Sequence, residues 1–254
     1  KMFSRRRFLS LVAAVAAVNV HRGIAGSESR PVRIGILAPS HCALPVVLAE
    51  ARGLFGPQGI EAEVRYFPEM GEIATALAAG ELEFGQLAVP MAVAVSEGVA
   101  GMPTRVPLTI VQVLGINGGA LSVGAATPIR KLAELNGRRI GIHNPWIIHR
   151  LIFLRMMDQY GMVPGRDFEL VQVPLSEMGA ALSQGRIDGF IGQEPAPSLL
   201  NAQRMVRLLL FTKTFWTDHP CCVLSTRREL FESDPGLVAN VTRAVMVAGL
   251  TLDS

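Results

Sequence analysis

The segment "DHPCCVL" at residues 218–224 places an aspartate, a histidine and two adjacent cysteines close together. Such residues can ligate zinc or form a reactive thiol. Zinc needs about four ligands at recognised spacings, and no second Cys/His pair lies near this segment in the sequence. Adjacent cysteines rarely bond to each other because disulfide geometry is strict, and cysteine is among the most buried residue types. The pattern therefore predicts that "CCVL" begins a buried strand and that no metal binds at 218–222.

The first 25 residues have the composition of an export signal. "SRRRFLS" at 4–10 precedes the apolar run "LVAAVAAV", which is shorter than the roughly 20 apolar residues of a transmembrane helix. Small residues at 23–25 predict cleavage near Ala25. The pair Arg5-Arg6 resembles a twin-arginine signal, and an ordinary secretory signal is the alternative. We expect the mature protein to be periplasmic.

The charge balance argues against a nucleic-acid partner. Five of the 24 basic residues lie in the signal, which leaves 19 basic against 21 acidic residues in the mature chain. Such a balance implies no basic face. The whole chain is 50% apolar and 18% charged, as in a well-packed protein of one large domain or two small ones.

Apolar strands alternate with amphipathic segments from Val32 onward, which predicts an α/β fold with mostly parallel sheet. We expect strands at 32–37, 60–67, 84–88, 108–115, 138–143, 168–174, 188–193 and 206–211. Helices are expected from Ser40 to Gly53, at 71–79 and 128–135, from Trp146 to Tyr160, at 176–184, from Glu194, and after Asp234-Pro235. The order predicts lobe 1 at 32–120, lobe 2 at 121–211, and a return to lobe 1 at 212–254 that ends before the lobe is complete.

Several segments carry a family likeness. "LAAGELEFGQLA" and "SQGRIDGFIGQEP" both join a helix, a glycine, an acidic residue and a buried strand, and "LGINGGALSVG" and "WTDHPCCVLSTRRELF" accompany them. With these segments the chain resembles the solute-binding proteins of ABC importers for nitrate, bicarbonate, sulfonates and taurine, most closely the nitrate/bicarbonate branch. The likeness covers nearly all of residues 32–250. Cys221 and Cys222 stand where that branch commonly has a charged residue, which puts an anion contact from that position in question.

The resemblance implies a two-lobed periplasmic binding protein type II fold, with a cleft between Rossmann-like lobes. It implies a monomer that binds a small oxyanion by lobe closure, delivers it to a membrane permease, and has neither catalytic activity nor a resident cofactor. It leaves room for a divalent cation that accompanies the anion.

Ligands of open α/β sheets bind at the carboxyl ends of the strands, so the candidate ligand-binding residues lie at strand-to-helix turns. The candidates are His41, Gln86, Trp146, His149, Glu194 and His219. Helix N-termini offer unpaired N–H groups to an anion, and the amide of Gln86 can also donate. Trp146 and His149 are three residues apart and would share a helical face. His219 is expected at the cleft mouth, whereas Asp188 is expected to be a turn residue.

Each of these candidates also has an ordinary structural interpretation. His41 could be an inert surface histidine, Gln86 a satisfied core amide, and Trp146 a residue that packs the helix against its sheet. Glu194 would complement the positive N-terminus of its own helix.

Two other functions remain open at this stage. One is a pyrimidine-precursor (thiamine-type) binding protein or synthase on the same fold; the other is a ligand sensor that acts through a protein partner. A hydrolase that uses Cys221 or Cys222 with His219 is disfavoured because no separate base with an orienting acid is evident. In an oxidising compartment, a disulfide from Cys42 to Cys221 or Cys222 also stays open.

Overall fold

The computed structural model describes residues 30–99 and 105–252. The expected export signal, with its arginine pair, lies outside the described residues. The chain divides into two compact units, Lys1–Arg30 and Pro31–Ser254, and every element named below belongs to the second. Among the described residues, no helix combines the length and the apolar character that crossing a bilayer requires.

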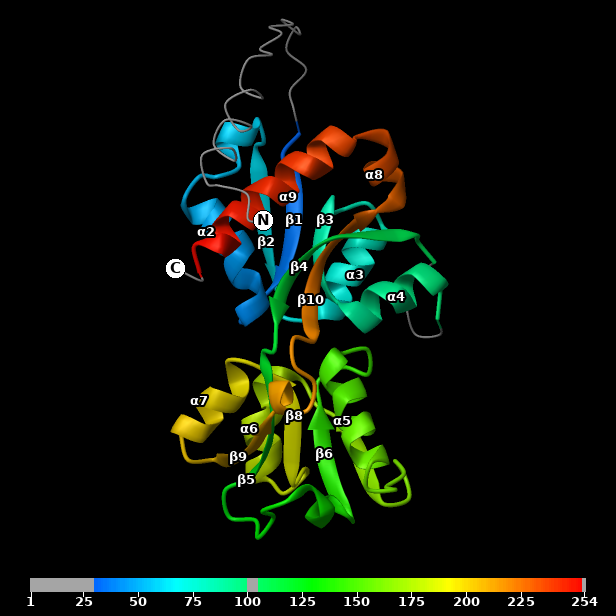
Figure 1. Ribbon diagram of the computed structural model, residues 1–254, viewed down its shortest axis with the longest axis vertical. Coiled ribbons are helices and arrows are strands. Elements are labelled where there is room, and N and C mark those ends of the chain that lie inside the picture. Colours follow the sequence, from blue (N-terminus) through cyan, green and yellow to red (C-terminus); the bar gives the residue numbers. More distant parts are fainter. Residues whose placement is uncertain (1–29, 100–104, 253–254) are drawn as a thin grey trace, which may run out of the picture. The chain divides into compact units, whose positions relative to one another are not determined.

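Two five-stranded sheets form the second unit (Figure 1). The first has the order β2-β1-β3-β10-β4, with β1 Val32–Leu37, β2 Ala62–Phe67, β3 Phe84–Ala88, β4 Leu108–Ile116 and β10 Pro220–Arg227. The second has the order β7-β6-β8-β5-β9, with β5 Gly119–Gly124, β6 Arg138–Ile142, β7 Phe168–Gln172, β8 Gly189–Gln193 and β9 Val206–Phe211. The chain therefore passes from the first sheet to the second between β4 and β5, and returns between β9 and β10.

Both sheets are mixed but mostly parallel, as expected, because four of the five strands in each point in the same direction while β10 and β5 are reversed. β1 runs parallel to β2 and β3, and β6 runs parallel to β7 and β8. β10 and β5 are antiparallel to both of their neighbours. Parallel neighbours need a crossover, usually a helix, whereas β5 and β10 enter their sheets directly from the two passages. β5 was not predicted because three of its six residues, in "GALSVG", are glycine or alanine.

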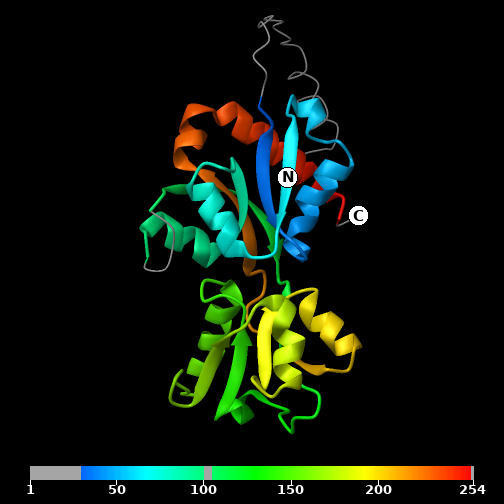
Figure 2. The same cartoon turned by 180° about the vertical axis from the view of Figure 1, so that it is seen from behind.

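Helices surround the two sheets. They are α2 Leu44–Ala51, α3 Met70–Ala78, α4 Val89–Glu97, α5 Ile148–Asp158, α6 Met178–Ser183, α7 Ala196–Ala202, α8 Arg228–Ser233 and α9 Pro235–Leu250. The 3₁₀ turns are η1 His41–Ala43, η2 Gly56–Gln58, η3 Leu132–Leu135, η4 Leu175–Glu177 and η5 Thr212–Thr214. α9 crosses in front of the first sheet in Figure 1, and the view from behind in Figure 2 shows α3 on the opposite face.

Three helix predictions need correction. Ser40 precedes the 3₁₀ turn η1, and its side chain makes no capping hydrogen bond there. The helix expected at 128–135 is only the 3₁₀ turn η3. α5 begins at Ile148, because the backbone is still extended at Ile147, so Trp146 precedes the helix and shares no helical face with His149.

The repeated sequence segments form the same carboxylate–arginine hydrogen-bond arrangement in each sheet. The Glu83 carboxylate accepts hydrogen bonds from the backbone N–H and the guanidinium of Arg33, and the Asp188 carboxylate does the same for Arg139. Each acid precedes the third strand of its parallel trio and bonds to the neighbouring strand. Asp188 is therefore a structural residue, and the shared glycine, acid and strand pattern reflects sheet assembly.

The three cysteines are buried in the apolar core. Cys42 is 0% exposed, and Cys221 and Cys222 are each 1% exposed. All three belong to a cluster that includes residues of both sheets, such as Leu87 of β3 and Ile140 of β6. The prediction that "CCVL" starts a returning buried strand is thus confirmed by β10.

Candidate functional site

A cavity of about 540 Å³ lies between loops of the two sheets. Its wall includes Leu37 at the end of β1 with Ala38 and Pro39 after it, Pro68 and Glu69 after β2, Leu175 and Ser176 after β7, and Pro195 and Ala196 after β8. All four strands belong to the parallel parts of the sheets, and their carboxyl ends are where open α/β folds bind ligands. Position in the fold therefore makes this cavity a candidate ligand site.

The wall of this cavity is chiefly apolar. Among the described residues, its polar side chains are Glu69, Ser176 and Gln203, and no lysine or arginine lines it. Burial, together with the nearby carboxylate of Glu72, raises the pKa of Glu69. An anion here would be held by N–H and O–H donors, because no formal positive charge faces it.

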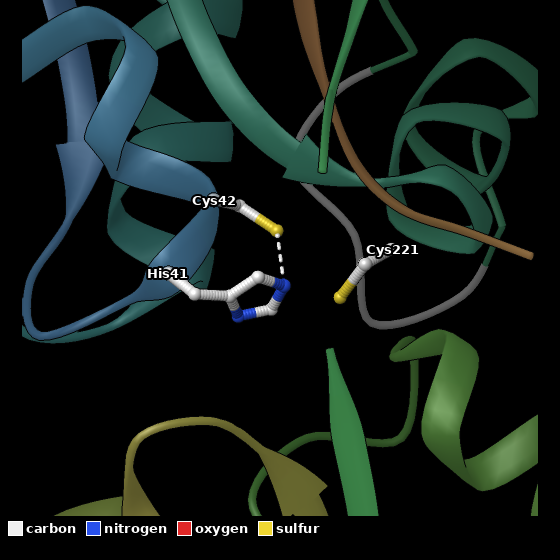
Figure 3. Close-up of side chains that lie close together, drawn as sticks. All are labelled: His41, Cys42 and Cys221. Carbon is white, nitrogen blue, oxygen red and sulfur yellow. Dashed lines mark hydrogen bonds between the residues drawn. The ribbon is translucent and has the colours of Figure 1, made fainter. Parts of the chain in front are cut away.

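A second group of polar side chains lies where the two passages meet the first sheet, and His41 is at its centre. Nδ1 of His41 is 3.2 Å from the carbonyl oxygen of Glu194, and the backbone N–H of His41 donates to the same oxygen. Nε2 of His41 is 3.1 Å from Sγ of Cys42 (Figure 3). The contact between His41 and Glu194 joins η1, which follows β1 of the first sheet, to the residue that follows β8 of the second sheet.

His149 approaches this group from α5. Its Nε2 lies 3.8 Å from Sγ of Cys221, and its Nδ1 is buried without a hydrogen-bond partner. Burial, with smaller contributions from His143, His219 and His41, lowers the pKa of His149 well below its usual value. The imidazole is therefore neutral at physiological pH.

The three thiols interact with one another. Hydrogen bonds from Cys221 and Cys42 lower the pKa of Cys222. Hydrogen bonds with Cys221 and Cys222, together with burial, raise the pKa of Cys42. The hydrogen bond with Cys222 and burial raise the pKa of Cys221, against the opposing effect of Cys42. The three sulfur atoms thus form one polar cluster inside an otherwise apolar core.

Some of the six expected ligand-binding residues line a pocket, and others are buried in the core. His41 and Glu194 come together and line a smaller pocket of about 430 Å³. Gln86 is 0% exposed, and its amide accepts from Leu37 N–H and donates to the Ser40 hydroxyl. None of the six lines the 540 Å³ cavity.

The other expected residues are in the core or beside it. Trp146 is half-buried and packs against the apolar cluster, and His149 is 1% exposed. His219 is 0% exposed and donates from Nδ1 to the Trp216 carbonyl. The expected position of His219 at a cleft mouth is therefore wrong, since η5 and the residues after it cover the ring.

Sequence reasoning missed Glu69 and Ser176 as cavity residues. They follow β2 and β7, the outer strands of the two parallel trios, whereas the candidate turns were sought after β1, β3, β6 and β8. Pro68, directly after a predicted strand, was the signal available for Glu69. The disulfide left open between Cys42 and Cys221 or Cys222 is not formed, since all three cysteines are free, although Cys42 and Cys221 do lie close together.

Comparison with known proteins identifies the family. A model of the NMT1-like family matches residues 25–254. The nitrate import ATP-binding protein NrtC of Synechococcus elongatus is 26% identical over 91% of this chain and 36% of its own length. The bicarbonate-binding protein CmpA of the same organism is 21% identical over 89% of this chain and 54% of its own. The chain thus spans only about a third to a half of these relatives.

A solved structure confirms the predicted fold. The periplasmic nitrate-binding protein NrtA from Synechocystis PCC 6803 superposes with a TM-score of 0.77 and 22% identity, covering 88% of this chain and 62% of NrtA. The relatives and this structural neighbour are nitrate and bicarbonate transport components, as the family likeness implied. The chain belongs to the NMT1-like family.

Proposed function

We propose that this chain is the periplasmic solute-binding component of an ABC importer, which takes a small oxyanion between its lobes and delivers it to a membrane permease. The observation that carries the proposal is the 540 Å³ cavity. Its wall combines strand-end loops from both sheets, in a fold shared with a periplasmic nitrate-binding protein. A solute in such a cavity contacts both lobes at once.

The solute class follows from the relatives and from the donors in the wall. NrtC and CmpA are named for nitrate and bicarbonate, and a sulfonate-like anion has the same donor requirements. Ser176 offers a hydroxyl, and α3 begins directly after Glu69. The first N–H groups of a helix have no partners within the helix and favour anions.

Closure by hinge motion is consistent with the chain path. Within residues 30–99 and 105–252, two passages connect the sheets, one at residues 117–118 and the other at 212–219. The solute would stabilise the closed arrangement because it contacts both walls, which is how binding proteins of this kind change conformation.

The apolar wall favours a second candidate solute, a pyrimidine or a related flat heterocycle. Such a ring needs a few hydrogen bonds and apolar surface, which Leu37, Leu175 and Leu199 supply. In the part of the chain that the structure describes, neither lysine nor arginine lines the cavity, which suits a neutral solute better than a strongly hydrated anion.

A thermal-shift screen followed by titration calorimetry tests both candidates. The probes are nitrate, nitrite, bicarbonate, short alkanesulfonates, taurine and simple pyrimidines, with chloride as the control. A solute present at 100 times its Kd stabilises the folded protein by about 2.7 kcal/mol. A shift with an oxyanion alone supports the first proposal, and a shift with pyrimidines alone replaces it with the second. Saturable turnover of any probe, or no shift with all of them, contradicts the binding-protein assignment.

A further inference from the structure

All three cysteines of the chain and four of its five histidines gather in one region. His41, His143 and His219 all act electrostatically on His149, and His143 also interacts with Cys222. The fifth histidine, His21, lies outside the described residues. Thiolate and imidazole are the ligands that zinc and copper prefer, so this gathering has the chemistry of a metal site.

Three ligand atoms in this region are already close to one another. Within residues 30–99 and 105–252, one atom each from His41, Cys42 and Cys221 lie within 4.8 Å of one another. Zn–S and Zn–N bonds of about 2.3 and 2.0 Å put ligand atoms of one tetrahedral ion about 3.5–3.8 Å apart. Closing on a metal therefore needs movements of about 1 Å or less. Figure 3 shows the Cys221 sulfur pointing toward the His41 ring from the opposite side of the gap.

The hydrogen bonding of His41 prepares it for coordination. A carbonyl oxygen can only accept, so the contact with the Glu194 carbonyl places the proton of the neutral ring on Nδ1. The lone pair of Nε2 then faces the Cys42 sulfur, 3.1 Å away. Histidine ligands of metals almost always donate their other N–H to a carbonyl or carboxylate in this way.

The surrounding backbone is shaped around these side chains. A Cβ atom at Gly115 would lie 2.7 Å from Sγ of Cys42, and one at Gly118 would collide with the imidazole of His41. Both ring nitrogens of His143 and Nδ1 of His149 are buried with no hydrogen-bond partner. Buried polar groups in native proteins nearly always have partners, so these two histidines retain unused hydrogen-bonding capacity beside the cluster.

We propose that His41 Nε2, Cys42 Sγ and Cys221 Sγ bind a Zn²⁺ ion at the junction of the two sheets. Two thiolates neutralise the charge of Zn²⁺, which suits a buried site, whereas Cu⁺ with the same ligands would leave a net negative charge. Binding converts two thiols to thiolates and releases two protons to solvent. Cys222, whose thiol interacts with the other two cysteines, and His149, whose Nε2 lies 3.8 Å from Cys221 Sγ, are the candidates for a fourth ligand.

This proposal replaces the sequence-based expectation that no metal binds at 218–222. That expectation rested on spacing along the chain, which cannot show that residues 41–42 lie beside residue 221. It is independent of the solute in the larger cavity, because none of the three ligands lines that cavity.

The test uses the full chain, reduced under anaerobic conditions and stripped of metal with a chelator. We expect one Zn²⁺ per chain in a competition titration, two or three protons released on binding, and a thiolate charge-transfer absorption when Co²⁺ replaces Zn²⁺. His41→Gln, Cys42→Ser and Cys221→Ser should each weaken Zn²⁺ binding by more than the 10–100-fold that is typical for partners outside the ligand shell. Ser225→Ala is the matched control, because Ser225 is also fully buried on β10 and has no hydrogen-bond partner. The Zn²⁺ affinity of this variant should equal that of the wild type.

Several results would overturn the zinc site. These are no Zn²⁺ binding by the reduced protein, equal affinities in the three ligand variants and wild type, or an equal loss in Ser225→Ala. A disulfide between Cys42 and Cys221 that persists in the isolated protein, revealed by thiol counting, would also exclude the site. Solute titrations with metal-free protein keep the two proposals separate, since failure at the zinc site leaves the solute result standing.

Discussion

Burial decides the protonation state of His143. The ring lies near Cys222 and His149 and has no hydrogen-bond partner, and burial lowers its pKa from 6.5 to about 4. In the unfolded chain the ring takes up a proton below about pH 6.5, whereas in the folded protein it stays neutral until about pH 4. The unfolded state therefore binds more protons in this window, and the free energy of unfolding falls as the pH is lowered through it.

We expect His143→Gln to reduce this acid sensitivity. The shift of about 2.5 pKa units corresponds to about 3 kcal/mol across the window. Denaturant unfolding of metal-free protein between about pH 7 and pH 4.5 should show a shallower decline in the variant than in wild type. The comparison uses the slope with pH, so a change in stability at neutral pH does not affect it. Parallel curves for the two proteins would show that His143 is already solvated or paired in the folded state.

At the scale of elements, replacing Asp188, the acid that precedes β8, should lower the free energy of unfolding more than replacing an exposed acid. Asp188→Ala removes hydrogen bonds to the backbone N–H and guanidinium of Arg139, and hydrogen bonds to charged groups contribute about 1.5–3 kcal/mol. Asp158→Ala is the control, because Asp158 pairs with Arg155 while both side chains are about 70% exposed. Such pairs contribute less than about 1 kcal/mol. Denaturation midpoints check the difference, and equal losses would mean that Asp188 has no special structural role.

How well the elements could be predicted depended on how local their signals were. β3, β9 and β10 follow from apolar runs, and α9 follows from Asp234, whose carboxylate accepts from Leu237 N–H at the first turn. β5 could not be predicted, because its hydrogen bonds to β8 and β9 outweigh the weak strand preference of its glycine and alanine.

The candidate site was harder to predict than the fold. His41 and Glu194 were found because each follows a predicted strand, and turns after strands are local features. The proximity of Cys42 to Cys221 depends on how the returning strand β10 pairs between β3 and β4, which no local pattern encodes. Gln86 was a candidate because it can donate, and only the packed structure shows that Leu37 and Ser40 already occupy its amide.

At the scale of the whole molecule, solute binding and lobe movement should fail together when the cavity is filled. Ala180 lines the 540 Å³ cavity from α6 and is exposed to solvent, so tryptophan at this position can occupy the cavity without disturbing the core. Ala180→Trp should weaken binding of the solute found by the screen at least about 10-fold, equivalent to about 1.4 kcal/mol. It should also abolish any solute-induced decrease in the radius of gyration measured by small-angle X-ray scattering. Ala202→Trp, an exposed position on α7 outside the cavity wall, should leave both unchanged. If Ala180→Trp binds as tightly as wild type, the solute lies elsewhere, and the smaller pocket beside His41 and Glu194 becomes the site to test.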